Sequence, residues 1–124
     1  MKEGCPYGTH RVISPKGVLP QPADIIDNTI EIYDNEILID VRTLNLDSAS
    51  FTQIKKQAKG DIEEMKKIMM GIAAIAGKLK NPVTGSGGML IGTVEKIGSA
   101  YKGSLRVGDK IATLVSLSLT PLVI

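Results

Sequence analysis

The sequence of 124 residues has few cysteines, histidines and aromatic residues, and each shortage excludes a kind of protein. One cysteine, Cys5, allows no internal disulfide and no cysteine-rich zinc site, which fits a reducing cytoplasm. Three tyrosines, one phenylalanine and no tryptophan, with a net charge of only +2, offer few stacking surfaces or basic patches for nucleic acid. We therefore expect a cytoplasmic protein with no nucleic-acid partner.

Long hydrophobic runs are also missing. No stretch reaches the roughly 18 uninterrupted apolar residues of a membrane span, and no apolar run follows Lys2 as it would in a secretory signal. We therefore expect no membrane partner. A hydrophobic fraction of 43% with 23% charged residues is typical of a single globular domain with a real core.

The first third of the chain predicts strands. Four of the six prolines lie within residues 5–27, which favours an arm wrapped around the domain, with an edge strand near residues 10–13. In residues 36–43, Ile37, Ile39 and Val41 alternate with Leu38, Asp40 and Arg42. This period of two is typical of a strand with one buried face. We predict a central barrel strand there.

Residues 61–79 predict one long amphipathic helix. Apolar residues recur every three or four positions, and charged residues fall between them. Asp61 with Glu64 three residues later forms a start signal, and Gly77 or the Asn81-Pro82 pair ends the pattern. We favour a surface helix docked on the domain over a roof for an active site or a subunit contact.

The last third returns to strands, at residues 89–97 and 110–119, with a turn at Gly108-Asp109 in which Asp109 is structural. The glycines at 85, 87, 88 and 92 precede a strand and do not open a helix, which is the wrong order for a dinucleotide fingerprint. We therefore assign no cofactor-binding residue.

The glycine-rich loop at 85–88, the strand after it and the Val107-Gly108-Asp109-Lys110-Ile111 turn together resemble the N-terminal GroES-like domain of the medium-chain dehydrogenase/reductase superfamily. The resemblance implies a mainly β domain with one long helix (α+β), built as a GroES-like β-barrel. In register, the zinc-binding cysteine of that superfamily falls on Asp47, and its histidine and glutamate fall on Gly88 and Met89. Glycine offers no ligand and a thioether suits zinc poorly, so we expect a zinc-free domain with no metal-binding residue.

Longer stretches narrow the resemblance. Residues 5–12, 15–22, 44–53, 81–92 and 108–121 are similar to the family of L-erythro-3,5-diaminohexanoate dehydrogenases of bacterial lysine fermentation. This resemblance implies oxidation of the 3-amino carbon with NAD to give 5-amino-3-oxohexanoate and ammonia. It also implies that residues 1–124 are the truncated N-terminal catalytic domain of a homo-oligomer. The nucleotide-binding domain would follow Ile124 and is not part of this sequence, so the domain alone is expected to be inactive.

Within this resemblance Asp47 is the candidate catalytic residue, as an ammonium partner or proton acceptor, because it falls where relatives place a metal ligand. Four side chains are candidates for orienting the diamino acid substrate by hydrogen bonds: Asn45, Ser48, Thr84 and Ser86. Arg11 or Arg42 could pair with the substrate carboxylate. The alternative for Asn45 and Asp47 is that they only close a turn after a strand.

Two other functions stay open at this point. One is a zinc-free quinone or enone reductase domain, because those enzymes also place a polar residue where Asp47 falls. The other is a non-enzymatic barrel that acts as an interaction module, because a fold alone does not fix a function. The remaining reactive residues, His10 and Cys5, are expected to be a packing or solvated side chain and an unreactive thiol.

Overall fold

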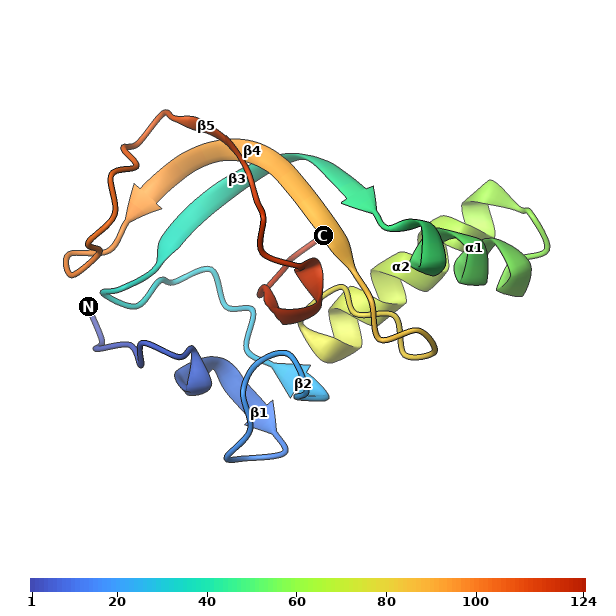
Figure 1. Ribbon diagram of the computed structural model, residues 1–124, viewed down its shortest axis with the longest axis horizontal. Coiled ribbons are helices and arrows are strands. Elements are labelled where there is room, and N and C mark those ends of the chain that lie inside the picture. The colour runs from blue at the N-terminus through green and yellow to red at the C-terminus, as the bar shows by residue number, and fades with distance from the viewer.

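The computed structural model describes all residues from 1 to 124 and contains two α-helices, five strands and two short 3-10 helices (Figure 1). In chain order these elements are η1 (Thr9–Arg11), β1 (Val12–Ser14), β2 (Ile25–Ile26), β3 (Ile37–Leu46), α1 (Ser48–Gln57), α2 (Ile62–Ala76), β4 (Gly88–Ile97), β5 (Lys110–Ala112) and η2 (Leu117–Leu119). The α+β class expected from the sequence is therefore right.

A three-stranded antiparallel sheet, in the order β3-β4-β5, forms an arch over the rest of the molecule (Figure 1). Strands β3 and β4 pair along their whole length, from Ile37 opposite Ile97 to Leu46 opposite Gly88, with two irregularities in register. The strands predicted at residues 36–43 and 89–97 are confirmed, and β3 runs three residues further than its pattern indicated.

The predicted GroES-like β-barrel is not confirmed. Strands β1 and β2 form a separate two-stranded sheet beneath the arch, and the two sheets share no strand, so no barrel closes (Figure 1). A barrel requires every strand to be paired on both sides, whereas β1 has three residues and β2 has two. Pro15, Pro20 and Pro22 lie between them and remove the amide donors that longer strands would need.

The domain has two helices where the sequence predicted one: α2 lies in the predicted span, and α1 was not predicted. Helix α1 begins where the Asp47 side chain caps its N-terminus, and it buries Ile54 and Ala58 against Met65 of α2. Gly60, with a φ of 79°, ends this turn, and Asp61 caps α2. Helix α2 confirms most of the predicted span and ends at Gly77, whose φ of 72° is the left-handed conformation of a helix end.

The predicted strand over residues 110–119 is wrong beyond Ala112. Strand β5 has three residues, and the chain then turns into η2, which Ser116 caps by accepting the Ser118 amide at 3.1 Å. This turn carries Leu117 under the arch. There it joins the main core of Leu79, Leu90 and Leu122, against which the inner faces of β3 and α2 pack.

Two lysines after α2 tie the proline-rich arm to the domain. Lys78 is 1% exposed, and its ammonium donates to the carbonyls of Pro20 at 2.6 Å and Gln21 at 3.0 Å. Lys80 also donates to the Gln21 carbonyl, at 2.8 Å. Burial, with a smaller contribution from the Lys80 charge, lowers the pKa of Lys78 to about 8. The segment around Gln21 is therefore held by ammonium groups that bond carbonyl oxygens.

Candidate functional site

Asp47 lies at the junction between β3 and α1. Its Oδ1 atom accepts the backbone N–H of Ser50 at 2.8 Å, which is the capping bond of α1, and the hydroxyl of Ser86 at 3.1 Å. Its own backbone N–H donates to the carbonyl of Gly87 at 3.1 Å. The carboxylate is thus fixed both to the helix that follows it and to the glycine-rich loop before β4.

Three hydroxyls surround Asp47 and form one chain of hydrogen bonds. The Ser86 oxygen lies 2.8 Å from the Ser50 oxygen and 2.6 Å from the Thr84 oxygen. Because Ser86 has one hydroxyl proton and gives it to Asp47, the hydroxyls of Ser50 and Thr84 donate to Ser86. We refer to Asp47, Ser50, Thr84 and Ser86 as the Asp47 cluster.

A buried asparagine holds the loop that carries Thr84 and Ser86. Asn81, 2% exposed, accepts the backbone N–H groups of Val83 at 2.8 Å and Thr84 at 3.2 Å through its side-chain oxygen. Its side-chain nitrogen donates to Gln53 of α1 at 2.8 Å. The position of the hydroxyls relative to Asp47 is therefore set by a second contact between the loop and α1.

Gly87 allows the same loop to lie against the core. A Cβ at this position would come within 2.7 Å of the Ser118 amide nitrogen and 2.8 Å of the Leu79 carbonyl oxygen. Only glycine permits such a close approach of backbone to backbone. Leu46, Ile54 and Leu79 lie beneath the cluster with no room for water, so a small molecule can reach Asp47 only from the solvent side.

The Asp47 carboxylate is charged at neutral pH. Partial burial raises its pKa, but the hydrogen bonds from the Ser50 amide and the Ser86 hydroxyl outweigh burial and hold the pKa below its ordinary value. These donors converge on Oδ1, and no group of the chain donates to Oδ2. The second oxygen is free to bond a cation that arrives from solution.

The structure brings together Asp47, Thr84 and Ser86 of the predicted site. The other two predicted residues stand apart: Asn45 is exposed on β3 opposite Met89, and Ser48 is the exposed first residue of α1. Sequence reasoning missed Ser50 and Asn81. The spacing of Asp47 and Ser50 is that of a helix cap and the amide it accepts, and this signal could have revealed both α1 and the role of Ser50.

A second carboxylate network lies at the other end of β3. The guanidinium of Arg11, a residue 5% exposed, donates to both oxygens of Glu36, at 3.0 and 2.7 Å, and to the carbonyls of Thr29 and Glu31. His10 adds a contact to Glu36 at 3.0 Å. We refer to Arg11, Glu36 and His10 as the Glu36 network.

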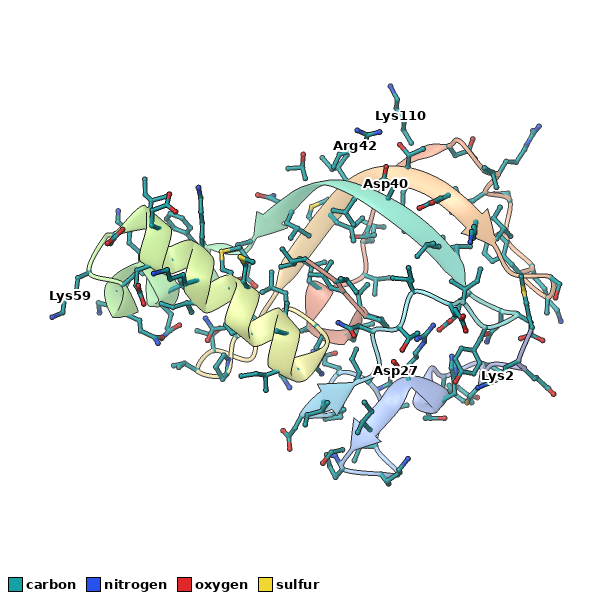
Figure 2. All side chains as sticks on the ribbon, turned by 180° about the vertical axis from the view of Figure 1, so that it is seen from behind. Lys2, Asp27, Asp40, Arg42, Lys59 and Lys110 are labelled. Atoms are coloured by element: carbon teal, nitrogen blue, oxygen red, sulfur yellow. The ribbon has the colours of Figure 1, made fainter.

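The Glu36 network has no free group for a substrate. Burial raises the pKa of Glu36, but the hydrogen bonds from Arg11, the Tyr33 amide and His10 prevail and lower it to about 2. The remaining N–H of Arg11 donates to the Asp27 carbonyl at 3.3 Å, so Arg11 has no donor left for a substrate carboxylate. Arg42 stands on the outer side of the arch near Asp40, at 3.6 Å, and points away from the molecule (Figure 2). Neither arginine meets the Asp47 cluster.

His10 is a packing residue, in line with the reading favoured from the sequence. Its Nδ1 accepts the Cys5 amide at 2.9 Å, and its ring lies 4.2 Å from the ring of Tyr33. Hydrogen bonds from the Thr9 side chain and from the Tyr7 backbone lower the pKa of the Cys5 thiol.

No group of three or more histidine, cysteine, aspartate or glutamate side chains comes close enough to hold a metal ion. The helix N-termini of this domain are also poor sites for the phosphates of a dinucleotide. A pyrophosphate prefers an uncapped helix N-terminus, but Asp47 occupies that of α1, and Asp61, Glu63 and Glu64 surround that of α2. Neither helix is long and apolar enough to cross a bilayer.

Comparison with known proteins adds a family to this geometry. A chain from Fusobacterium nucleatum subsp. nucleatum named L-erythro-3,5-diaminohexanoate dehydrogenase is 68% identical over 124 residues. A protein of the same name from Acetoanaerobium sticklandii is 63% identical over 122 residues. The alignments cover 98% and 97% of this chain but 36% of each relative, so the chain spans about a third of their length.

The family model described as the L-erythro-3,5-diaminohexanoate dehydrogenase N-terminal domain matches residues 10–124. The matched region contains every residue of the Asp47 cluster and of the Glu36 network. The resemblance seen in the sequence is therefore confirmed at the level of the family. This chain belongs to the family of L-erythro-3,5-diaminohexanoate dehydrogenase N-terminal domains.

Proposed function

We propose that this chain is the N-terminal catalytic domain of a cytoplasmic oxidoreductase that oxidatively deaminates L-erythro-3,5-diaminohexanoate to 5-amino-3-oxohexanoate. The names of two relatives more than 60% identical to the chain support the reaction. NAD, the hydride acceptor in this proposal, would be held by a part of the protein outside residues 1–124. The domain alone would be inactive, and the full-length enzyme would be a zinc-free homo-oligomer.

The observation that carries the proposal is the free oxygen of an ionised Asp47. The substrate bears two amino groups, and both are ammonium ions at neutral pH before the reaction. Oδ1 of Asp47 is fixed by Ser50 and Ser86, so Oδ2 can be aimed at a cation without loss of side-chain entropy. We assign Asp47 the role of ammonium partner, with Thr84 and Ser86 orienting its carboxylate.

The electrostatics favour this role over that of a general base. The hydrogen bonds that lower the pKa of Asp47 also weaken the carboxylate as a proton acceptor at neutral pH. They strengthen its preference for a cation. The same charge argues against the quinone reductase alternative, since hydride transfer to a neutral quinone develops negative charge on its oxygens, which a carboxylate beside it would oppose. Asn45 and Ser48, exposed on either side of Asp47, remain candidates for contacts to the rest of the substrate.

The test is the Asp47→Asn variant of the full-length enzyme, because asparagine also caps helices well and leaves α1 intact. Loss of one partner of a partly desolvated charge pair costs on the order of 2–4 kcal/mol, so kcat/KM for the diamino acid should fall roughly 30- to 1000-fold. The affinity for NAD should stay unchanged. Asp40→Asn, at an exposed position on the outer side of β3, is the matched control.

Two results would contradict the assignment. Near-normal kcat/KM in Asp47→Asn would leave Asp47 as a helix cap and nothing more. An equal loss in Asp40→Asn would show that the effect comes from the overall charge of the domain, not from the cluster.

A further inference from the structure

Helix α2 changes character halfway along its length. Its first half carries four charged residues, Glu63, Glu64, Lys66 and Lys67, whereas its second half, from Ile68 to Ala76, has no charged or polar side chain on any side. A surface helix of a globular protein keeps a polar face toward water, and a helix that is apolar all round is normally covered. The second half is not covered in this domain: Met70 is 54% exposed and Ile75 is 76% exposed.

An apolar groove lies along this half of the helix. It has a volume of about 420 Å³ and is lined by Met70, Gly71, Ala73 and Ala74 of α2 on one side and by Leu122, Val123 and Ile124 on the other, with Asn28 at its edge. Gly71 has open space beside it, with no atom within 4 Å of where a Cβ would stand. The floor is therefore accessible to a partner side chain.

Two hydrogen bonds fix the second wall of the groove. The Leu122 amide donates to the Gly77 carbonyl at 2.9 Å, and the Asn28 side chain donates to the Leu122 carbonyl at 2.8 Å. Leu122 enters the core, while Val123 and Ile124 stay 58% and 53% exposed. The groove is thus built from anchored segments and would keep its shape in a larger protein.

We infer that this groove is the surface on which the remainder of the full-length enzyme, the part that follows the N-terminal domain, packs through apolar side chains. The inference depends on the proposed domain arrangement, not on the reaction. In each relative the matched region is 36% of the chain, so nearly two thirds of that relative lies outside the region that corresponds to this domain. Residues 122–124 form one wall, so the groove adjoins the point where that part of the chain would begin.

The chemistry of the groove excludes other kinds of occupant. It carries no charged residue, so an acidic or basic peptide would gain no ion pair there, and its single polar side chain, Asn28, already donates to Leu122. Small residues at 71, 73 and 74 let a neighbouring backbone or a branched side chain approach closely. Such a surface suits a permanent contact within one protein, where burial of apolar area supplies the stabilisation.

The experiment is photo-cross-linking of the full-length protein with photo-methionine in place of methionine, a nearly isosteric exchange. Chains with light and heavy isotopes are co-expressed, so that links within one chain differ in mass from links between copies. Met70 should link to residues after 124 of the same chain. Met65, 8% exposed between α1 and α2, is the internal control and should link within residues 1–124.

A matched pair of variants sharpens the result. Ala74→Asp places a charge in the groove and should lower the yield of the Met70 link at least fivefold, whereas Ile62→Asp, on the charged half of α2, should leave it unchanged. Met70 links only to a second copy, or only within residues 1–124, would overturn the inference. Neither readout uses catalytic activity, so failure here is distinct from failure of the proposed reaction.

Discussion

The two ends of β3 each hold a carboxylate whose pKa is lowered, yet the two carboxylates differ in what remains free. At the start of the strand, both oxygens of Glu36 are bonded by the buried guanidinium of Arg11. At the end of the strand, one oxygen of Asp47 takes the Ser50 and Ser86 donors, and the other oxygen has none. A lowered pKa alone therefore does not identify a functional site.

The difference follows from the groups that supply the donors. A guanidinium presents a planar fork that matches both oxygens of a carboxylate, so the Glu36 pair is complete within the fold. A helix N-terminus and a serine hydroxyl approach Asp47 from one side and leave the carboxylate charge unneutralised. We expect the first arrangement to stabilise the domain and the second to bind a ligand.

The largest effect on stability should come from Glu36→Gln. The variant leaves the Arg11 charge buried without its partner, which costs about 3–5 kcal/mol in the free energy of unfolding. Urea denaturation followed by circular dichroism measures it, with the exposed Glu95→Gln as control. A loss below about 1 kcal/mol would mean that solvent replaces the lost carboxylate and that the Glu36 network is not a buried pair.

Acid should reveal the same network in the unchanged protein. The pKa of Glu36 is about 2 in the folded state and 4.5 in the unfolded chain, so between these values the unfolded chain binds the proton first. The contribution is complete above about pH 4.5 and is lost as the pH falls toward 2. We expect the ionised Glu36 to contribute roughly 2–3 kcal/mol to the free energy of unfolding, because solvent screens its side chain, which is 20% exposed.

Denaturation midpoints measured from pH 6 to pH 2 test this contribution. Glu36→Gln removes the titrating group, so its stability should depend less steeply on pH than that of the parent protein. Identical slopes for the two proteins would assign the acid sensitivity to other carboxylates.

Substitutions of Asp47 should have a smaller effect on stability, and they should separate its role as the cap of α1 from its proposed role in substrate binding. Asp47→Ala removes the cap of α1 and should cost about 1 kcal/mol, whereas Asp47→Ser keeps a capping oxygen and should cost a few tenths of a kcal/mol. Both variants lose the charge, so both should lose substrate binding in the full-length enzyme. If activity instead follows stability, with Asp47→Ser active and Asp47→Ala inactive, Asp47 serves only the helix.

Zinc should have the smallest effect of all. The resemblance to the zinc-dependent dehydrogenases noted in the sequence would place the ligand positions at Asp47, Gly88 and Met89, and the last two offer no hard ligand. We expect no stoichiometric zinc in the purified protein and a thermal midpoint that does not change with chelator or added zinc. One tightly bound zinc per chain would contradict this expectation.

Local patterns in the sequence were sufficient for elements whose cause is local. The alternation that predicts β3, the period of α2 and the turn at Asp109, which accepts the Arg106 amide at 2.8 Å, all depend on neighbouring residues. Helix α1 was missed because Ser48 to Thr52 reads as polar and turn-forming, and the buried residues Ile54 and Ala58 are too few for a clear period.

The rest could not be predicted because it depends on contacts between distant segments. The barrel failed because strand closure needs long-range pairing, which short β1 and β2 do not supply. For the site, the sequence indicated Asp47, Thr84 and Ser86, which lie in one cluster. It could not show that Asn81 bonds Gln53 across 28 positions, nor that Arg11 is committed to Glu36 across 25.

The proline-rich arm has two attachments, one through Arg11 and one through Lys78, and only the first is sensitive to acid. The attachment through Arg11 depends on a carboxylate and weakens as Glu36 takes up a proton. The attachment through Lys78 depends on an ammonium that keeps its donors at every pH below 8. In an acidic medium we therefore expect the end of the arm at Arg11 to loosen before the segment around Gln21, so that proteases cut within residues 1–11 first.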